Sequence, residues 1–222
     1  MNDDSATDGD SATDKDSATD KDSARDGLRE RTRRAVRAEL SGLALAMFAE
    51  RGFDQTTVDE IARAGGLTKR SFFRYFPAKE DVVFGGVDVL GEQVVEEIRA
   101  RPAGEDPWEC LHQVLRRWEE RIHGSERELA AHRLVESTPS LRARRHEKRE
   151  QWRSRVSAAL RDRAGATLDS FTADLLTNAA SAALDTVSRE WLRSGGTADR
   201  AALTDRAFAL LRPAFLGDRG RR

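Results

Sequence analysis

The chain has 222 residues, with 38 Lys and Arg against 39 Asp and Glu and a formal net charge of −1. It has no uncharged apolar run of about 18 residues and no apolar N-terminal stretch, so we expect neither a transmembrane helix nor a secretory signal. Its single cysteine, Cys110, excludes an internal disulfide framework and a multi-cysteine zinc site. These features predict a cytoplasmic protein of one or two domains.

The N-terminus carries an acidic repeat. Residues 4–27 read DSATDG, DSATDK, DSATDK and DSARDG, with no large apolar residue to bury, so we predict a disordered tail over residues 1–27. Nine Asp against Lys15, Lys21 and Arg25 give this tail a charge of −6, which leaves +5 for the rest. The repeat lacks the spacing of a calcium-binding loop, so we expect a solvated segment. A second hypothesis is that its charge competes with DNA for the basic surface.

The chain after residue 27 is predicted to be helical almost throughout. Ala, Leu, Arg and Glu dominate, and no strand-like alternation persists. Connections rich in Gly, Pro, Ser or Thr separate the segments. The predicted helices cover residues 28–51, 57–65, 68–76, 79–99, 107–123, 125–136, 139–163, 168–193 and 199–216.

Two short helices within residues 57–76 have the spacing of a helix-turn-helix. Thr57 and Glu60 form a capping-box pattern, Thr68 is the expected second N-cap, and Gly66 lies in a turn where positive φ is tolerated. Both helix N-termini suit a phosphate, because their backbone N–H groups are free of helical partners. The residues expected to bury the inner faces are Ile61, Leu67, Phe72 and Tyr75.

The outer face of the second short helix carries Lys69, Arg70, Phe73 and Arg74. Arg forms two hydrogen bonds with guanine edges, and the N-terminal part of this helix enters the major groove in helix-turn-helix proteins. The pattern therefore favours DNA binding. The alternative is a helical hairpin whose charges are merely solvated.

Residues 31–84 resemble the DNA-binding domain of the TetR family of bacterial transcriptional repressors. The resemblance rests on the run AMFAERGFDQTTVDEIARAGGLTKRSFFRYFPAKEDVV. It implies that Thr57 and Lys79 bind phosphate, that Lys69 and Arg70 face bases or nearby phosphates, and that Ser71 and Arg74 lie at the groove surface. The family usually has tyrosine where Phe73 stands, and a small residue at the position of Arg70. Arg70 is therefore our candidate specificity determinant, and Phe73 is expected to contact thymine methyls or sugars.

The resemblance also implies an all-α architecture in two parts. A three-helix DNA-binding domain would occupy residues 28–78, a helical ligand-binding and dimerisation domain residues 79–217, and a basic tail residues 218–222. Residues 132–163 look like those of an actinobacterial subgroup thought to bind acyl-CoA-like ligands.

Two apolar stripes near the C-terminus are the expected dimer surface, giving a four-helix interface with two-fold symmetry. The alternative is that both stripes belong to the intramolecular core. The first stripe is Phe171, Leu175, Ala179, Ala182, Ala183 and Thr186, and the second is Leu203, Ala207, Leu210 and Leu211.

The predicted effector contacts are five residues of the helix expected over residues 107–123 and one later tryptophan. Tryptophan at helical spacing is also typical of a core. The candidates are Trp108, Leu111, His112, Leu115, Trp118 and Trp152. A basic cluster would meet a ligand phosphate or form a solvated face. It consists of Arg142, Arg144, Arg145, Lys148 and Arg149. Cys110 is expected to be a buried small hydrophobe.

The sequence predicts a dimeric, sequence-specific regulator. We expect a repressor that a small hydrophobic or acyl-CoA-like effector releases from a near-palindromic operator. The alternatives are an activator and a DNA-binding regulator without an effector. No catalytic motif, cofactor site or metal-ligand spacing is present in the sequence, and no membrane contact is expected.

Overall fold

The computed structural model describes residues 13–121 and 126–215 of the chain. Within those ranges the protein is built from helices without a strand, which confirms the all-α prediction. The α-helices are α1 (Thr13–Arg51), α2 (Val58–Ala64), α3 (Lys69–Tyr75), α4 (Asp81–Ala100), α5 (Pro107–Arg121), α6 (Glu126–Ser137), α7 (Pro139–Ala164), α8 (Ser170–Arg193) and α9 (Arg200–Phe215). A short 3-10 turn, η1 (Gly165–Thr167), precedes α8. Among the described helices, none has the length and apolar character needed to cross a membrane.

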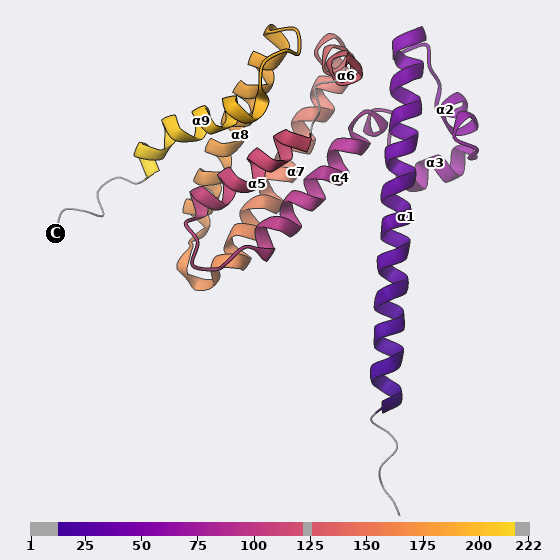
Figure 1. Ribbon diagram of the computed structural model, residues 1–222. Helices are drawn as coiled ribbons and strands as arrows, with labels where there is room; N and C mark the ends of the chain where they lie inside the picture. Colours follow the sequence, from indigo (N-terminus) through magenta and orange to yellow (C-terminus); the bar gives the residue numbers. More distant parts are fainter. Residues whose placement is uncertain (1–12, 122–125, 216–222) are drawn as a thin grey trace, which may run out of the picture.

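The first helix differs from its prediction. It begins at Thr13, so residues 13–27 continue the helix where a disordered tail was expected. Adding residues to an existing helix avoids the unfavourable nucleation step, and the repeat contains Ala, Lys and Arg, which are good helix formers. Figure 1 shows this part of α1 running beyond the other helices. Residues 1–12 and 218–222, also assigned to tails, lie outside the described residues.

The other boundaries lie close to those predicted. The largest differences at described helix starts are at α4 and α8, which begin at Asp81 and Ser170 instead of residues 79 and 168. Helix α8 begins two residues later than predicted because Asp169 is its N-cap. The Asp169 carboxylate accepts a hydrogen bond of 2.9 Å from the Thr172 amide.

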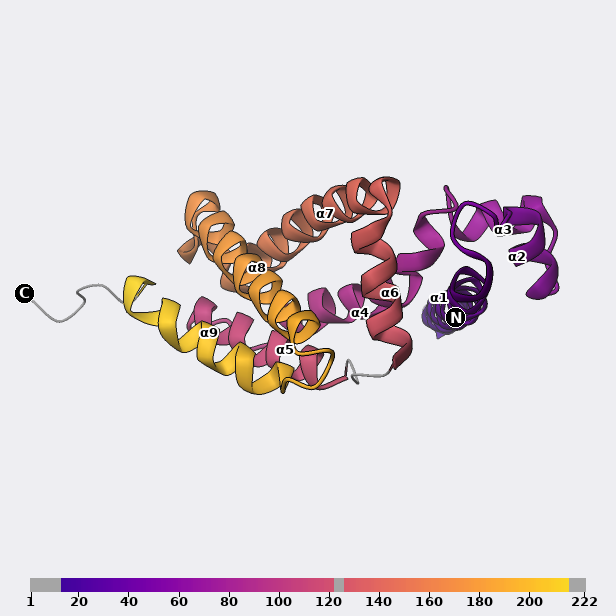
Figure 2. The same cartoon turned by 90° about the horizontal axis from the view of Figure 1, so that it is seen from above.

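The helix-turn-helix and the two C-terminal apolar stripes lie at opposite ends of the molecule. In both ribbon views, α1, α2 and α3 lie at one end and α9 at the other, with α4 and α6 between them and α5 and α8 beside α9 (Figures 1 and 2). Two clusters of buried side chains underlie this arrangement. One joins α1–α3 to the start of α4, the end of α6 and the start of α7, and the other joins the rest of α4 to α5, α7, α8 and α9.

Helix α4 connects the two cores. Val82, Val83 and Phe84 pack in the first core, whereas Val94, Val95 and Ile98 pack in the second. The predicted domain boundary at residue 78 therefore precedes three α4 residues of the first core. At Gly85, a Cβ atom would lie 2.2 Å from Ser41 Oγ and 2.9 Å from the Phe76 ring, so glycine permits the close approach of α4 to α1.

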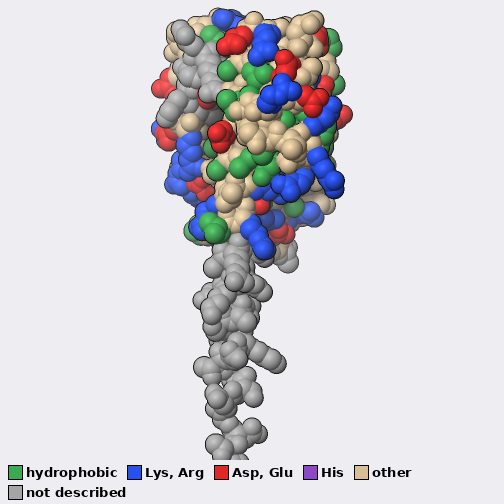
Figure 3. All heavy atoms as spheres, turned by 90° about the vertical axis from the view of Figure 1, so that its right-hand side faces the viewer, with side chains coloured by type: hydrophobic (Ala, Val, Ile, Leu, Met, Phe, Trp, Pro, Cys, Tyr) green, Lys and Arg blue, Asp and Glu red, His purple; other side chains and the backbone are tan. Residues whose placement is uncertain are grey.

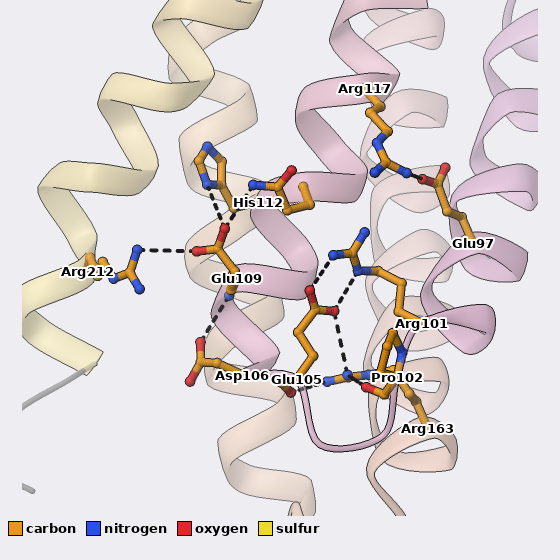
Figure 4. A network of polar contacts seen from close by, with 11 residues as sticks. Glu97, Arg101, Pro102, Glu105, Asp106, Glu109, His112, Arg117, Arg163 and Arg212 are labelled. Atoms are coloured by element: carbon orange, nitrogen blue, oxygen red, sulfur yellow. Dashed lines mark hydrogen bonds and ion pairs between the residues drawn. The ribbon is translucent and has the colours of Figure 1, made fainter.

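The C-terminal end of α4 is held by a network of ionic and polar contacts (Figure 4). Arg101 Nε donates to Glu105 at 2.5 Å across the loop between α4 and α5. The buried Arg163 of α7 donates to the Pro102 carbonyl at 2.5 Å and to the Glu105 carbonyl at 3.1 Å. This network fixes the loop against α7.

Candidate DNA-binding surface and ligand cavity

The start of α2 forms the predicted capping box. The Thr57 hydroxyl accepts a hydrogen bond of 3.3 Å from the Glu60 amide, and the Glu60 carboxylate accepts one of 2.8 Å from the Thr57 amide. Hydrogen bonds from the Thr57 backbone and side chain lower the pKa of Glu60, with Arg51 contributing through its charge. Glu60 also accepts from Arg51 Nη1 at 3.0 Å.

The turn and α3 also form as the sequence predicts. Gly66 has a φ of 67°, and the Thr68 hydroxyl accepts a hydrogen bond of 3.1 Å from the Ser71 amide. Ile61 and Phe72 are completely buried, and Leu67 and Tyr75 pack against the same core. Phe72 and Phe76 lie 5.4 Å apart between ring centroids. Short helices without strong intrinsic stability are thus held by packing and by caps.

The outer face of α3 presents its basic side chains to solvent. Lys69, Arg70 and Arg74 are exposed, and Phe73 is 44% exposed. Lys69 Nζ lies 2.9 Å from the Asp59 carboxylate of α2, a surface pair in which both partners are more than half exposed. Such a pair is worth little, so a phosphate could replace Asp59 at low cost. Figure 3 looks onto this end of the molecule and shows Lys and Arg side chains on its surface.

Two of the residues expected to bind phosphate are engaged within the protein. The Thr57 hydroxyl donates to Glu60 at 2.8 Å, as does its amide, so both donors already face a carboxylate. Lys79 Nζ donates to the carbonyls of Phe53 at 2.9 Å and Thr56 at 3.2 Å, and lies 4.1 Å from the centre of the Phe53 ring. In the structure Lys79 therefore holds the segment that leads into α2, and its phosphate contact stays a prediction.

A cavity of about 210 Å³ lies between α4, α5, α6, α7 and α8. Trp118 and Trp152 line it with near-parallel rings, 6.4 Å between centroids and 22° between planes. The other apolar residues of the wall include Val83, Phe84, Val87, Val135 and Leu184. Pockets for small molecules typically combine such an apolar wall with a few directed polar groups.

Several cationic side chains of the basic cluster reach this cavity. Arg145, Lys148 and Arg149 line it, whereas Arg142 and Arg144 do not. Each of the three has an acidic partner. Arg145 lies 2.5 Å from Glu136, Lys148 lies 2.7 Å from Asp88, and Arg149 pairs with Asp185. Burial lowers the pKa of Arg149, although Asp185 acts against that effect.

Further from the surface, Arg200 and Glu119 form a buried ion pair beside the cavity. The Arg200 side chain is 6% exposed and lines the cavity, and Glu119 is completely buried. Burial raises the pKa of Glu119, with Arg200 acting in the opposite direction. Arg200 Nη1 is buried without a hydrogen-bond partner among the described residues, and so is the indole Nε1 of Trp118. Two unused donors therefore belong to residues of the cavity wall.

Four of the predicted effector contacts lie elsewhere. Trp108, Leu111 and Leu115 are buried in the second core, because they recur at spacings of three and four residues on the face of α5 that packs against α4, α8 and α9. Trp108 Nε1 donates to the Phe208 carbonyl at 3.3 Å. His112 is bonded to Asp205 of α9 at 2.8 Å and lies beside Glu109 (Figure 4). Of the six candidates, only Trp118 and Trp152 line the cavity.

Several lining residues were not among the six predicted effector contacts. His132 of α6, Arg155 of α7 and Arg200 of α9 come from segments far apart in the chain. Burial, followed by the charges of Arg200 and Arg145, lowers the pKa of His132 to about 4. No local pattern marks these residues, since only the packing of α5–α9 brings them together.

Two acidic residues of α4 pair with α7, and one of them, Asp88, also pairs with α1. Asp88 accepts from Arg37 of α1 at 2.8 Å and from Lys148 at 2.7 Å, and it lines the cavity. Asp81, which is 2% exposed in its side chain, accepts from Arg144 at 2.8 and 2.9 Å and caps the Ala78 amide at 3.1 Å. Burial opposes ionisation of Asp81, but Arg144 and Lys148 outweigh it and hold its pKa below the usual value.

The two C-terminal stripes divide between surface and core. Ala183 is buried, and Ala179, Ala207 and Leu211 pack against the second core, as the intramolecular alternative expects. The remaining positions include large apolar side chains facing solvent, with Phe171 exposed by 75%, Leu175 by 47% and Leu210 by 73%. Ala182 and Thr186 are also exposed, and Leu203 is half-buried. An apolar face therefore remains uncovered on α8 and α9.

Cys110 is completely buried, as predicted. Burial raises the pKa of its thiol to about 11, so the reactive thiolate is scarce at neutral pH. Among the described residues, no group of three or more His, Cys, Asp or Glu side chains has the geometry to hold a metal ion.

Two family models match this chain, one in its N-terminal part and one in its C-terminal part. Residues 42–84 match the family model for bacterial regulatory proteins of the tetR family, and residues 105–216 match the MftR C-terminal domain. The transcriptional regulator TcmR of Streptomyces glaucescens is 33% identical over 203 residues, which are 86% of this chain and 89% of TcmR. The repressor KstR2 of Mycobacterium tuberculosis is 49% identical over 47 residues, 21% of this chain and 24% of KstR2.

Solved structures of low sequence identity share the fold. NalD, the secondary repressor of the MexAB-OprM efflux pump in Pseudomonas aeruginosa, superposes with a TM-score of 0.55 at 19% identity, over 85% of this chain and 100% of NalD. The repressor FadR of Thermus thermophilus, in complex with lauroyl-CoA, gives 0.51 at 20% identity, over 84% and 98%.

Proposed function

The chain belongs to the TetR family of bacterial transcriptional regulators, and we propose that it is a dimeric repressor released from its operator by a small molecule. Members of this family regulate transcription by binding DNA and are not enzymes. The operator, the dimer and the effector are the parts of the proposal that require experiment.

The observation that carries the proposal is the outward face of α3. Lys69, Arg70 and Arg74 are exposed on a helix whose opposite face is fixed by Phe72 and by the Thr68 cap. A rigid helix with free guanidinium groups fits the major groove, where arginine reads guanine and backbone contacts set the register. We assign base reading to Arg70, apolar contact with thymine methyls or sugars to Phe73, and phosphate contact to Lys69. Ser71 and Arg74 are assigned to the groove surface.

The uncovered apolar face of α8 and α9 supports the dimer. Phe171, Leu175 and Leu210 expose most or about half of their side chains, and a second copy placed across a two-fold axis would cover all three. The face lies at the end of the molecule opposite α3, so two copies joined there would carry one α3 each on either side of the axis (Figure 1). A two-fold dimer reads two inverted half-sites.

The cavity supports the effector. It adjoins α4, and Asp88 belongs both to its wall and to the contact with Arg37 of α1. A ligand that changes the position of α4 would therefore change the position of α1, and with it the position of α2 and α3. Release requires only that the ligand bind more tightly to the conformation that does not fit the operator.

The test is selection of duplexes from a random DNA pool by the purified full-length protein at one stated salt concentration. We expect enrichment of two inverted half-sites whose spacing places both on the same side of the duplex. Heat-denatured protein is the first control. The variant Arg70→Ala is the second, and it should relax the preference at one base position of each half-site. A pool no more enriched than that from denatured protein would contradict the proposal.

A further inference from the structure

We propose that the cavity is built for a compact, planar aromatic anion and not for an acyl-CoA. This inference rests on the proposed function, since it names the effector class of the same site. Three properties of the cavity lead to it: its aromatic wall, its unused hydrogen-bond donors, and the charges of its wall and of the adjoining groove.

The wall favours a flat ring system. Trp118 and Trp152 present near-parallel rings to the cavity, and Phe84 adds a third aromatic side chain. Aromatic rings gain from offset or edge-on contact beyond the area they bury. The space is about 210 Å³. An engineered apolar cavity of about 150 Å³ accepts benzene, so the present cavity suits a ligand of about two fused rings.

The unused donors call for an acceptor on that ligand. Trp118 Nε1 and Arg200 Nη1 are both buried without a partner among the described residues, on two residues of the wall. A buried donor without an acceptor is costly, and a carboxylate or phenolate oxygen would satisfy it. Arg155, also in the wall, forms no ion pair with the described part of the chain, unlike Arg145, Lys148 and Arg149. Its exposed guanidinium is a cation that a ligand can pair with without breaking an ion pair of the described residues.

The charges nearby argue against a polyphosphate tail. The cavity wall holds five cationic side chains and two acidic ones. Glu136 and Glu119, which lie outside the wall, pair with two further cations, so four of the five are paired and one unpaired cation favours a single anionic group. The groove that adjoins the cavity shares Asp88, Lys148 and Arg155. There the charges balance, because Arg37, Lys148 and Arg155 face Asp88, Glu92 and Glu150. A coenzyme A moiety leaving the cavity by this groove would meet no net positive charge.

The test compares four named probes by isothermal titration calorimetry on the full-length protein without DNA. They are 2-naphthoate, its neutral isostere 2-naphthamide, the aliphatic anion decanoate, and lauroyl-CoA. We expect 2-naphthoate to bind at least about tenfold more tightly than each of the other three, since charge-assisted hydrogen bonds of this kind are worth that factor or more.

Two variants locate the site. Trp118→Phe keeps a ring but removes the indole donor, and Arg155→Met removes the unpaired cation. Each should weaken 2-naphthoate about fivefold or more. Arg155→Met should leave 2-naphthamide within about twofold, whereas Trp118→Phe should weaken 2-naphthamide too, but less than 2-naphthoate, because the amide carbonyl is a neutral acceptor. Trp108→Phe and Arg161→Met change the same residue types on α5 and α7 outside the cavity wall and should change neither affinity. Thermal melts of all four variants check that they are folded.

Three results would overturn the inference: equal affinity for 2-naphthoate and 2-naphthamide, tightest binding of lauroyl-CoA or decanoate, or no binding of 2-naphthoate. The proposed function fails by a different readout, because the duplex selection contains no ligand. If 2-naphthoate binds as expected but leaves DNA binding unchanged, the inferred ligand class is supported. In that case the ligand does not release the protein from DNA.

Discussion

The carboxylate of Asp88 in α4 lies 2.8 Å from the guanidinium of Arg37 in α1, and the same oxygen lies 2.7 Å from Lys148 Nζ in α7. One acidic side chain thus joins the first DNA-binding helix to the wall of the cavity. Arg37 also lies 5.5 Å from the centre of the Phe76 ring, at the end of α3. Arg37 therefore connects Asp88 to α1 and to the C-terminal end of α3.

Asp88→Asn removes the charge that holds these two cations. We expect the free energy of unfolding to fall by roughly 1.5–3 kcal/mol, the range for hydrogen bonds to charged groups, because all three side chains are mostly buried. Urea denaturation measures the loss. Glu96→Gln is the matched control on the same helix, since Glu96 is 59% exposed and pairs with Arg34 at the surface. It should cost under about 1 kcal/mol, and an equal loss in both variants would contradict the special role of Asp88.

Arg70→Ala removes the proposed base-reading guanidinium from the exposed face of α3. Binding to the selected duplex should weaken by roughly 1–3 kcal/mol, and the preference at one base position should relax. Fluorescence anisotropy on the selected duplex and on single-base variants measures both effects. Arg99→Ala removes an exposed arginine near the end of α4 and serves as the control. An identical loss on every duplex would show that Arg70 contacts phosphate alone.

Lys79→Met tests whether this lysine holds the backbone or a phosphate. Because Nζ is bonded to the carbonyls of Phe53 and Thr56, we expect the free energy of unfolding to fall by about 1.5–3 kcal/mol. The slope of log K against log salt concentration should stay at the wild-type value. Lys69→Met should instead reduce that slope by about one unit with little change in stability. If Lys79→Met instead reduces the salt slope and leaves the free energy of unfolding unchanged, Lys79 contacts a DNA phosphate, as the sequence predicted.

His132 makes stability depend on pH. Its pKa is lowered to about 4 by burial and by the nearby Arg200, Arg145 and Arg149, with Glu136 acting against them. An unfolded chain binds a proton near pH 6.5, so between about pH 6.5 and 4 the unfolded state holds more protons than the folded state. Stability is therefore lost as pH falls through this window, by up to about 3 kcal/mol.

Urea denaturation between pH 7 and pH 4.5 measures this loss in wild type and in His132→Gln, which cannot gain the proton. The loss should be smaller in the variant. His146→Gln, at an exposed histidine of α7, should follow the wild-type curve. Parallel curves for all three proteins would assign the acid sensitivity to other groups.

Leu210→Glu places a charge in the apolar face of α8 and α9. If a second copy covers this face, the buried charge has no partner and the dimer should dissociate. Sedimentation velocity should show a monomer at concentrations where the wild type is a dimer. Leu28→Glu changes an exposed leucine of α1, 58% exposed, and should leave the wild-type oligomer intact. A dimer that survives Leu210→Glu would place the interface elsewhere.

The sequence predicted the helix-turn-helix well because its determinants are local. Thr57 and Glu60 are three residues apart, and Gly66 supplies the positive φ of the turn. The cavity was predicted poorly because its wall is assembled from distant segments. Trp118 and Trp108 were both predicted effector contacts, but Trp118 lines the cavity and Trp108 is buried in the second core, and only the packing of α5 against its neighbours distinguishes them. Lys79 looked like a surface cation, and nothing local shows that two carbonyls of an earlier loop bind it.

A hydroxyl-radical footprint of the full-length protein on the selected duplex at fixed salt tests most directly whether a dimer reads DNA through α3. We predict two protected patches related by a two-fold axis, appearing together as protein is added, because one dimer presents two α3 helices. Leu210→Glu should need a far higher concentration to give the same protection. A single asymmetric patch, or the same footprint from Leu210→Glu at wild-type concentration, would contradict a dimeric regulator that reads DNA through α3.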